Sequence, residues 1–178
     1  MPTYVAFLRA VNVGGRTVKM AALRDHLTGA GLGDVETYIQ TGNVRFTSTL
    51  RSQPKVRSFL EGTLAEHCGF DVACMVYRPG DLPGILADAE GLPPLVDGTD
   101  IRRYVTFLAE DPDGTAADAV AALEYPGEAV RVVGRAAHWQ IQGPFHQAKL
   151  SNARLEKLLG PGTTRDLKVV RTLAGMWG

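Results

Sequence analysis

Short apolar runs and amphipathic segments follow one another along the first part of the chain. Residues 3–11 are mostly apolar, aromatic or β-branched, which predicts a buried strand. Apolar residues at helical spacing downstream of Thr17 predict a helix, with Thr17 as its N-cap. Polar and apolar residues then alternate over 34–48 on both sides of Gly42-Asn43, a pair that favours a hairpin turn. The order so far is strand, helix and two antiparallel strands.

A second amphipathic helix and one more strand complete this half of the pattern. Pro54 suits the first turn of that helix, Gly69 suits its end, and the apolar run over 71–77 predicts the strand. The order β-α-β-β-α-β, with helices as crossovers, is typical of a ferredoxin-like unit. A short helix over 81–90 follows, and the Pro- and Gly-containing segment 91–100 predicts a linker.

The same pattern then returns, because RRYVTFLAE at 102–110 repeats the apolar positions of PTYVAFLRA at 2–10. Thr115 is the expected cap of the next helix, and alternation around Gly134-Arg135 predicts a second hairpin. A leucine-rich helix follows and is expected to end at Gly160-Pro161.

The repeat is expected to break at its end. Apolar residues at helical spacing after Thr164 predict a final helix capped by Thr164, where the first half has a strand. The sequence therefore predicts an α+β fold of duplicated ferredoxin-like (βαββα) units, with mostly antiparallel sheets packed by helices. The first half is expected over 1–90, the linker over 91–100, and a variant second half over 101–178.

Composition is typical of a folded globular protein rather than a disordered chain. Of 178 residues, 45% are hydrophobic and 21% are charged. No apolar run is long enough to cross a membrane and no signal peptide is recognisable, so we expect a cytoplasmic protein without a membrane partner. Cys68 and Cys74 lack the spacing of a zinc or redox motif, and we expect both to be reduced packing residues.

Charge is unevenly distributed although the net charge is zero. Residues 1–57 carry 8 Lys and Arg against 3 Asp and Glu, and residues 131–178 carry 8 against 2. Residues 81–128 reverse this balance, with 2 against 11. If the two basic ends meet, one face would attract anions; solvated charge on separate faces is the alternative.

The adjacent glycines of VNVGGRTVKM, at 11–20, lie between a predicted strand and a predicted helix. They lack the GxxxxGK[ST] spacing of a P-loop and the GxGxxG spacing of a dinucleotide fold, so neither of those sites is expected. Amide groups at the turn, with nearby cations, could still bind an anion. A turn without any ligand is the alternative, and on the residues alone it is favoured.

A second basic segment, at 149–165, places hydroxyls and cations around two predicted helix starts. Ser151 and Thr164 are also explained as helix caps. If this segment meets the glycine loop, the two would form one anion site. The ligand-binding residues expected on this hypothesis are Arg9, Asn12, Gly14, Gly15, Arg16, Lys19, Asn43, Lys149, Ser151, Asn152, Thr163, Thr164 and Arg165.

Other chemistry finds little support in the sequence. The four histidines form no HxH or HExxH motif, so no metal site is expected. No GxSxG elbow or other activated nucleophile is present, and no catalytic residue or cofactor is assigned. Whether the protein is an enzyme, and its oligomeric state, stay open. An RNA-binding sheet is disfavoured because GNVRFTS lacks the paired aromatics of an RNA-recognition motif, and Phe7 is expected to face the helices.

Three separated motifs resemble the bacterial domain-of-unknown-function family 1697, over nearly the whole chain. They are YVAFLRAVNVGGRTVKMAALRDHL, DVETYIQTGNVRFTS and KLSNARLEKLLG with TTRDLKVVRTL. The resemblance implies duplicated ferredoxin-like units, and it implies no reaction, cofactor or substrate. Its signature positions include Met20 and Gly42 besides most of the ligand-binding candidates. Two positions depart from the family, where Ala10 replaces a usual glycine and Asp166 a common asparagine. Ala10 suggests a less demanding backbone, and Asp166 adds a negative charge beside the expected anion site.

Our leading hypothesis is therefore a protein that binds a small anionic or phosphorylated ligand, with a nucleotide as one form of that ligand. The 12–19 loop and the 149–165 segment would form the pocket. The alternative is a non-enzymatic module that binds nucleic acid or protein through an exposed sheet, with Phe46 as the stacking residue.

Overall fold

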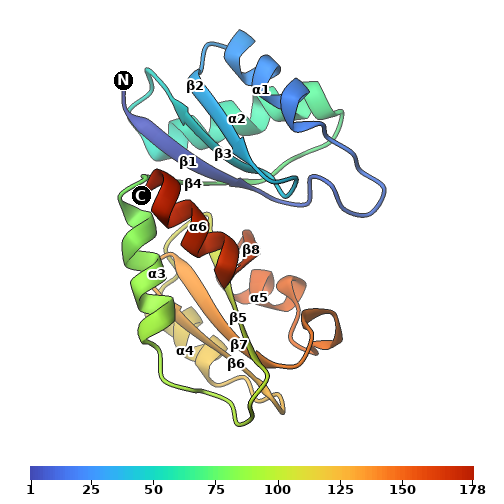
Figure 1. Cartoon of the computed structure of the whole chain (residues 1–178), viewed down its shortest axis with the longest axis vertical. Coiled ribbons are helices and arrows are strands. Elements are labelled where there is room, and N and C mark those ends of the chain that lie inside the picture. Colours follow the sequence, from blue (N-terminus) through green and yellow to red (C-terminus); the bar gives the residue numbers. More distant parts are fainter. The chain divides into compact units, whose positions relative to one another are not determined.

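The chain folds into two compact units in a computed structural model that describes all residues 1–178 (Figure 1). The first unit comprises Met1–Asp81 with Trp177, and the second comprises Leu82–Met176 with Gly178. The boundary between the units follows Asp81, the first residue of a helix, so nearly all of that helix belongs to the second unit. The sequence pattern predicted that the first half ends at residue 90. Each unit contains one four-stranded sheet.

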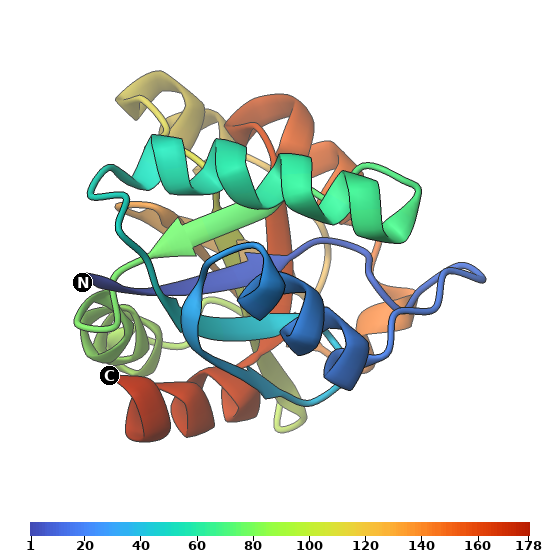
Figure 2. The same ribbon diagram turned by 90° about the horizontal axis from the view of Figure 1, so that it is seen from above.

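The first unit has the β-α-β-β-α-β order predicted from the sequence. Its elements are β1 (Thr3–Leu8), α1 (Met20–Gly29), β2 (Gly33–Tyr38), β3 (Asn43–Thr47), α2 (Gln53–Cys68) and β4 (Cys74–Tyr77). The strands pair in the order β2-β3-β1-β4, and every pairing is antiparallel. Both α1 and α2 cover one face of this sheet (Figure 2).

Alternation along β1 decides which side chains meet the helices. Tyr4, Ala6 and Leu8 point into the core beneath α1 and α2, together with Phe46 of β3. Phe7 points to the opposite face, where it is fully buried and meets the ring of Tyr77 edge-on. The expectation that Phe7 faces the helices was therefore wrong, because a strand residue adjacent to Ala6 must lie on the other face.

Two local details of the first unit also differ from the prediction. Helix α1 begins at Met20 after Lys19, so Thr17 does not cap it. The hairpin turn occupies residues 39–42, with Gly42 at φ +84°, and Asn43 already belongs to β3. The predicted ends of α2 are confirmed, because Pro54 lies in its first turn and Gly69 follows it at φ +74°.

Ala10, which replaces the family's usual glycine, adopts a left-handed backbone with φ +55°. The expectation of a less demanding backbone at this position was wrong. An L-residue in this region carries a steric cost between its Cβ and the following carbonyl, which glycine avoids. The chain thus keeps a left-handed conformation at residue 10 although alanine replaces the usual glycine.

The second unit repeats the same order of elements and adds a helix on each side. These elements are α3 (Asp81–Gly91), β5 (Ile101–Leu108), α4 (Gly114–Ala121), β6 (Glu128–Val133), β7 (Ala136–Gln142), the 3-10 turn η1 (Phe145–Gln147), α5 (Asn152–Leu159), β8 (Gly162–Asp166) and α6 (Leu167–Trp177). The strand order β6-β7-β5-β8 matches that of the first sheet position by position. The α+β fold of duplicated ferredoxin-like units is thus confirmed.

Residues 162–166 form a strand where we predicted only a helix. β8 pairs antiparallel with β5, with Thr164 opposite Thr106, so the repeat does not break at this point. Helix α6 begins afterwards at Leu167, and Asp166 caps it by accepting the N–H of Lys168 at 2.7 Å. The cap at Thr164 was wrong because that residue lies inside the strand.

The core of the second unit lies between its sheet and helices α4 and α5. Val120 of α4, Leu155 of α5 and Trp139 of β7 belong to its buried cluster. The indole N–H of Trp139 donates to Thr106 Oγ1 at 2.8 Å, so its one polar group is satisfied inside the core. The predicted cap of α4 at Thr115 was wrong, because Asp113 accepts the N–H of Ala116 instead.

Helix α3 packs within the second unit. The guanidinium of Arg103 on β5 donates to the carbonyls of Ala89 and Leu92, at the C-terminal end of that helix. Arg171 of α6 forms an ion pair with Glu90 of α3 at 2.8 Å. None of the helices is long and apolar enough to cross a membrane.

Replacing Ala10 with glycine is expected to stabilise the protein. Relief of the left-handed backbone should raise the free energy of unfolding by about 1 kcal/mol, measured by urea denaturation. Ala87, exposed in the middle of α3, provides the matched control, because Ala87→Gly should lower the free energy of unfolding by about 0.5–1 kcal/mol. Equal losses in both variants would contradict a strained backbone at Ala10.

Candidate functional site

The glycine loop is held in place by one side chain, that of Asn12. Its Nδ2 donates to the carbonyls of Val18 at 3.1 Å and Gln40 at 2.6 Å, and its Oδ1 accepts the N–H of Val18 at 2.6 Å. These bonds close the loop onto itself and onto the hairpin turn at 39–42. Asn12 therefore has a structural role, as the turn interpretation expects.

Two different physical reasons explain the glycines of this region. Gly14 and Gly15 have φ of +59° and +84°, and a Cβ on either would meet no atom within 4 Å, so only their backbone conformation requires glycine. A Cβ on Gly42 would come within 2.7 Å of Val11 and 2.8 Å of Leu8. Gly42 is thus required by close packing as well as by its φ.

The remaining first-unit candidates lie at or near this loop. The guanidinium of Arg16 lies 4.4 Å from the centre of the Phe70 ring, within range of a cation–π contact. The backbone N–H of Arg9 donates to the carbonyl of Ala73, and Lys19 is exposed directly before α1. Asn43 is buried and donates to Tyr38 and Thr41 within the turn.

The second basic segment divides between the two faces of its sheet. Ser151 caps α5, because its Oγ accepts the N–H of Arg154 at 3.2 Å. Thr164 of β8 donates to Asn152 Oδ1 at 2.6 Å, so these two candidates meet at the start of α5. Thr163 lies on the opposite face of β8, as strand alternation requires.

Arg165 has its guanidinium beside Thr163, to whose hydroxyl its Nη1 donates at 2.9 Å. It also donates to the carbonyl of Thr164. Burial lowers the pKa of Arg165 to about 10, so it remains protonated at neutral pH. The structure therefore gathers Lys149, Ser151, Asn152 and Thr164 around the start of α5, and it places Thr163 and the guanidinium of Arg165 apart from them.

A groove with a volume of about 630 Å³ opens between α4, α5 and the segment before α5. We call it the Lys149 groove. Its apolar surface comes from Ala119, Leu123, Tyr125 and Leu158, and its cations are Lys149, Arg154 and Lys157. No carboxylate lines it, and none of the three cations forms an ion pair.

A carboxylate behind the groove fixes its shape. Both oxygens of Glu128 accept backbone N–H groups, from Lys149 at 2.6 Å and Leu150 at 2.7 Å. The same turn carries Tyr125, which forms a bridge with Glu128. Lys149 and Tyr125 are distant in the sequence, and these bonds hold them on one wall.

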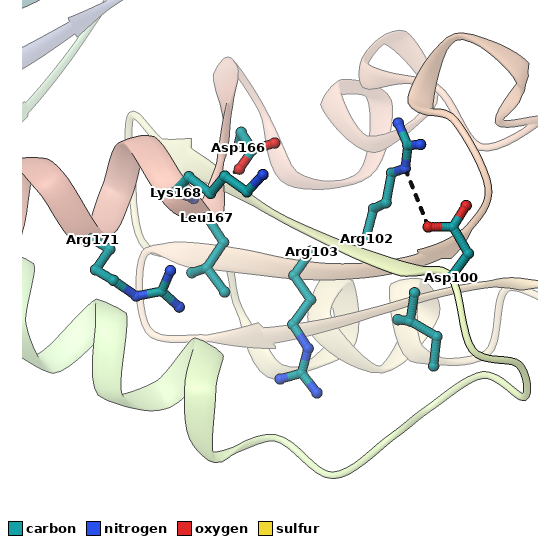
Figure 3. A pocket seen from close by; sticks show the side chains of 8 residues that line it. Asp100, Arg102, Arg103, Asp166, Leu167, Lys168 and Arg171 are labelled. Atoms are coloured by element: carbon teal, nitrogen blue, oxygen red, sulfur yellow. Dashed lines mark hydrogen bonds and ion pairs between the residues drawn. The ribbon is translucent and has the colours of Figure 1, made fainter.

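A second hollow, with a volume of about 550 Å³, lies at the start of α6 (Figure 3). Its four cations are Arg102, Arg103, Lys168 and Arg171. Their charge is partly neutralised, because Asp100 pairs with Arg102 at 3.7 Å and Glu90 pairs with Arg171. Asp166 accepts the Lys168 N–H at the start of α6. Figure 3 also shows Arg102 directed away from Arg103, as neighbours on a strand must be.

Sequence reasoning did not select Arg154, Lys157 or Tyr125 as site residues. Arg154 and Lys157 stand three residues apart on α5, a spacing that places both on one helix face and could have indicated a basic surface. Tyr125 gave no such signal, because the contacts of Glu128 alone bring it to the groove.

The aromatic residues considered for nucleic-acid stacking are not available at the surface. Phe46 is fully buried beneath α1 and α2, where it stacks on Tyr4 with ring centres 5.8 Å apart. A base could not reach its face. The stacking form of the nucleic-acid alternative therefore fails at this residue.

The two thiols show little reactive character. Burial raises the pKa of both Cys68 and Cys74, so neither is a thiolate at neutral pH, and the two form no disulfide. No group of three or more His, Cys, Asp or Glu side chains is arranged to hold a metal ion.

Comparison with known proteins identifies the family. The profile of the family described as "Protein of unknown function (DUF1697)" matches residues 1–138. The chain belongs to this family. No curated protein matches the chain.

A solved structure extends the DUF1697 comparison to the whole chain. It is that of a conserved bacterial protein, SP0830 from Streptococcus pneumoniae, with 27% sequence identity and a TM-score of 0.72. The match covers 99% of this chain and 98% of that chain. The segment 149–165, which lies beyond the family profile, is thus included in the shared fold.

His138 is an unusual buried group in this DUF1697 protein. The side chain is in β7, 2% exposed, and neither ring nitrogen has a hydrogen-bond partner within the protein. Burial lowers the pKa of His138, an effect that the charge of Asp88 opposes in part. The folded protein therefore holds this imidazole neutral over a range where the unfolded chain would protonate it.

Removing the side chain of Asn12 is expected to destabilise the first unit. Asn12→Ala loses three hydrogen bonds and leaves the Val18 N–H without its acceptor, so the free energy of unfolding should fall by about 1–3 kcal/mol in urea denaturation. Thr17→Ala is the matched control in the same loop, because Thr17 is exposed. Its effect should stay within about 0.5 kcal/mol. Similar values for both would show that Asn12 does not hold the loop.

Stability should decrease on mild acidification because of His138. A lowered pKa in the folded state means that the stabilisation is complete above the unfolded value of 6.5 and is lost as the pH falls below it. The free energy of unfolding, measured between pH 7.5 and pH 5 (about the range in which histidine titrates), should fall in the wild type. It should fall less in His138→Phe, which cannot titrate, whereas exposed His146→Gln should retain the wild-type slope. Identical slopes in all three proteins would exclude His138 as the cause.

Proposed function

We propose that the protein binds a small anionic, phosphorylated or carboxylated ligand in the Lys149 groove. The observation that carries the proposal is the set of three cations, Lys149, Arg154 and Lys157, around a groove without a carboxylate. Unpaired cations that converge on one concavity attract anions more strongly than cations already neutralised by neighbouring acids. A volume of about 630 Å³ falls within the usual range of small-molecule sites.

The start of α5 adds neutral hydrogen-bond donors to these charges. The N–H groups of Asn152 and Ala153 precede Arg154, the first residue whose N–H donates within the helix, and they bond to no other group of the protein. The helix dipole favours a negative charge at this end. Ser151 contributes a hydroxyl at the same place, two residues after Lys149.

The hollow at α6 is the less favourable of the two basic sites in the second unit. Glu90 and Asp100 already pair with two of its four cations, and the carboxylate of Asp166 already accepts the Lys168 N–H at the start of α6. An incoming anion would have to displace those acids. The Lys149 groove imposes no such competition.

The proposal rests on the second unit alone. In the first unit, Asn12 and Asn43 are engaged by the backbone of their own loops, and Arg16 lies over Phe70. The expected ligand contacts of the 12–19 loop and of Arg9, Gly14, Gly15 and Lys19 stay a prediction from the sequence and carry no part of this proposal. We take the protein to act in the cytoplasm, as expected from its sequence.

Pyrophosphate and a panel of sugar phosphates and nucleotides provide the test, by thermal shift at low ionic strength. A compound at a hundred times its dissociation constant should stabilise the protein by about 2.7 kcal/mol. The double variant Lys149→Glu/Arg154→Glu should abolish the shift, because it reverses two of the three charges. Added salt should weaken the shift, since exposed charges are screened.

Lys168→Glu is the matched control, because it places the same charge reversal in the α6 hollow of the same unit. It should leave the pyrophosphate shift intact. Loss of the shift in Lys168→Glu, with retention in the double variant, would move the site to α6. Absence of any shift across the panel would reject the proposed function.

A further inference from the structure

The Lys149 groove contains an aromatic ring and a guanidinium that form the widest of three cation–π pairs described here. The carbon at the centre of the Arg154 guanidinium lies 5.7 Å from the centre of the Tyr125 ring. Two other cation–π pairs of the protein are tighter, at 4.4 Å for Arg16 over Phe70 and 4.1 Å for Arg78 over Tyr4. The Tyr125 ring is therefore only loosely covered.

We propose that the groove takes an anion whose negative group is attached to a planar aromatic ring, and that this ring is held between Tyr125 and Arg154. The inference rests on the proposed function, and it adds the chemical class of the ligand. A phosphate or carboxylate would lie at the start of α5, and the ring would lie beside it against Tyr125.

Distances support this arrangement. A planar group between two others needs about 7 Å from the lower plane to the upper one, since each contact takes about 3.5 Å. The Arg154 guanidinium carbon lies 5.7 Å from the centre of the Tyr125 ring, which is within the range of a cation–π contact and about 1 Å less than a ring held between the two groups requires. Arg154 is exposed, and its side chain forms no hydrogen bond with the protein, so a rotamer change can supply the difference.

The two walls differ in rigidity in a way that suits such a clamp. Tyr125 is half-buried against the core of the second unit and is held by the bridge with Glu128, so its ring offers a fixed platform. Arg154 contributes a planar, delocalised cation that stacks on rings as well as attracting anions. Its own backbone N–H is bound by Ser151, which ties the clamp to the helix start where the anion would lie.

The apolar part of the groove is too small to favour a long hydrocarbon chain. Leu123, Ala119 and Leu158 flank Tyr125 over a limited area, and Lys157 adds a charge to the same groove. A single ring fills such a surface and leaves its anionic group among the cations. The shape and the charge of the groove thus favour the same compact, flat ligand.

Phenyl phosphate and cyclohexyl phosphate form a matched pair of probes, equal in charge and similar in size but different in planarity. Isothermal titration of the full chain at low salt should give a dissociation constant about tenfold lower for phenyl phosphate, as expected for one stacked ring. Two variants then test the walls. Arg154→Lys keeps the charge and removes the planar cation, and Tyr125→Leu keeps an apolar surface and removes the ring.

In each variant the dissociation constants of the two esters should lie within about twofold of each other, so the preference for phenyl phosphate is lost, a factor of two being small beside the tenfold effect of stacking. Lys157→Arg should retain the preference, which controls for changes of charge type in the groove. Circular dichroism checks the fold of Tyr125→Leu, and Arg154→Lys, at an exposed position, tests the clamp independently of that fold.

The outcomes separate the inference from the proposed function. Equal affinity of the two esters in the wild type, or a preference that survives in both wall variants, would overturn the aromatic clamp and leave anion binding in place. No binding of either ester, with no shift by pyrophosphate, would reject the proposed function itself.

Discussion

Alternation of side chains along the central strands is the constraint on which the rest of the structure depends. β1 and β5 each lie in the middle of an antiparallel sheet, so every residue on them is committed to one face. On β1 this sends Tyr4, Ala6 and Leu8 under the helices and Phe7 to the other side. On β8, paired with β5, it separates Thr164 from its neighbour Thr163, and so divides a basic segment that is continuous in the sequence. Side chains that are neighbours along the chain therefore serve different surfaces.

The fold could be predicted well from the sequence where the apolar residues followed either strand alternation or helical spacing over many residues. It could be predicted less well where a short segment suited both. The order of the first unit and both hairpins followed from strand alternation and helical spacing, which extend over many residues. β8 escaped because it is short and passes directly into α6 with no glycine or proline between them. Its β-branched pair, Thr163-Thr164, also suits a helix start, so Asp166 was passed over as the cap. Ala10 shows the opposite case, a backbone conformation that the local residue type gives no reason to expect.

The candidate site was predictable only in part, because its walls come from separate segments. Lys149, Ser151 and Asn152 could be selected from a local cluster of cations and hydroxyls at a helix start. Tyr125 joins them because the Glu128 carboxylate accepts the N–H groups of Lys149 and Leu150. By charge alone, Glu128 would count against an anion site. Contacts between residues so far apart in the chain produce no regular pattern of apolar and polar residues, so the sequence does not predict them. Residue type showed which chemistry was available, and tertiary structure selected the residues that share a groove.

Pro54 marks a difference between the two units at the start of equivalent helices. It lies in the first turn of α2, the counterpart of α5 in the repeated order of elements, and it removes one backbone donor from that helix start. Ser52, at the N-cap of α2, forms no capping hydrogen bond, whereas Ser151 caps α5. The two copies thus share a scaffold and differ at equivalent helix starts. An anion at the start of α2 would therefore find one backbone donor fewer than at the start of α5, which has no proline.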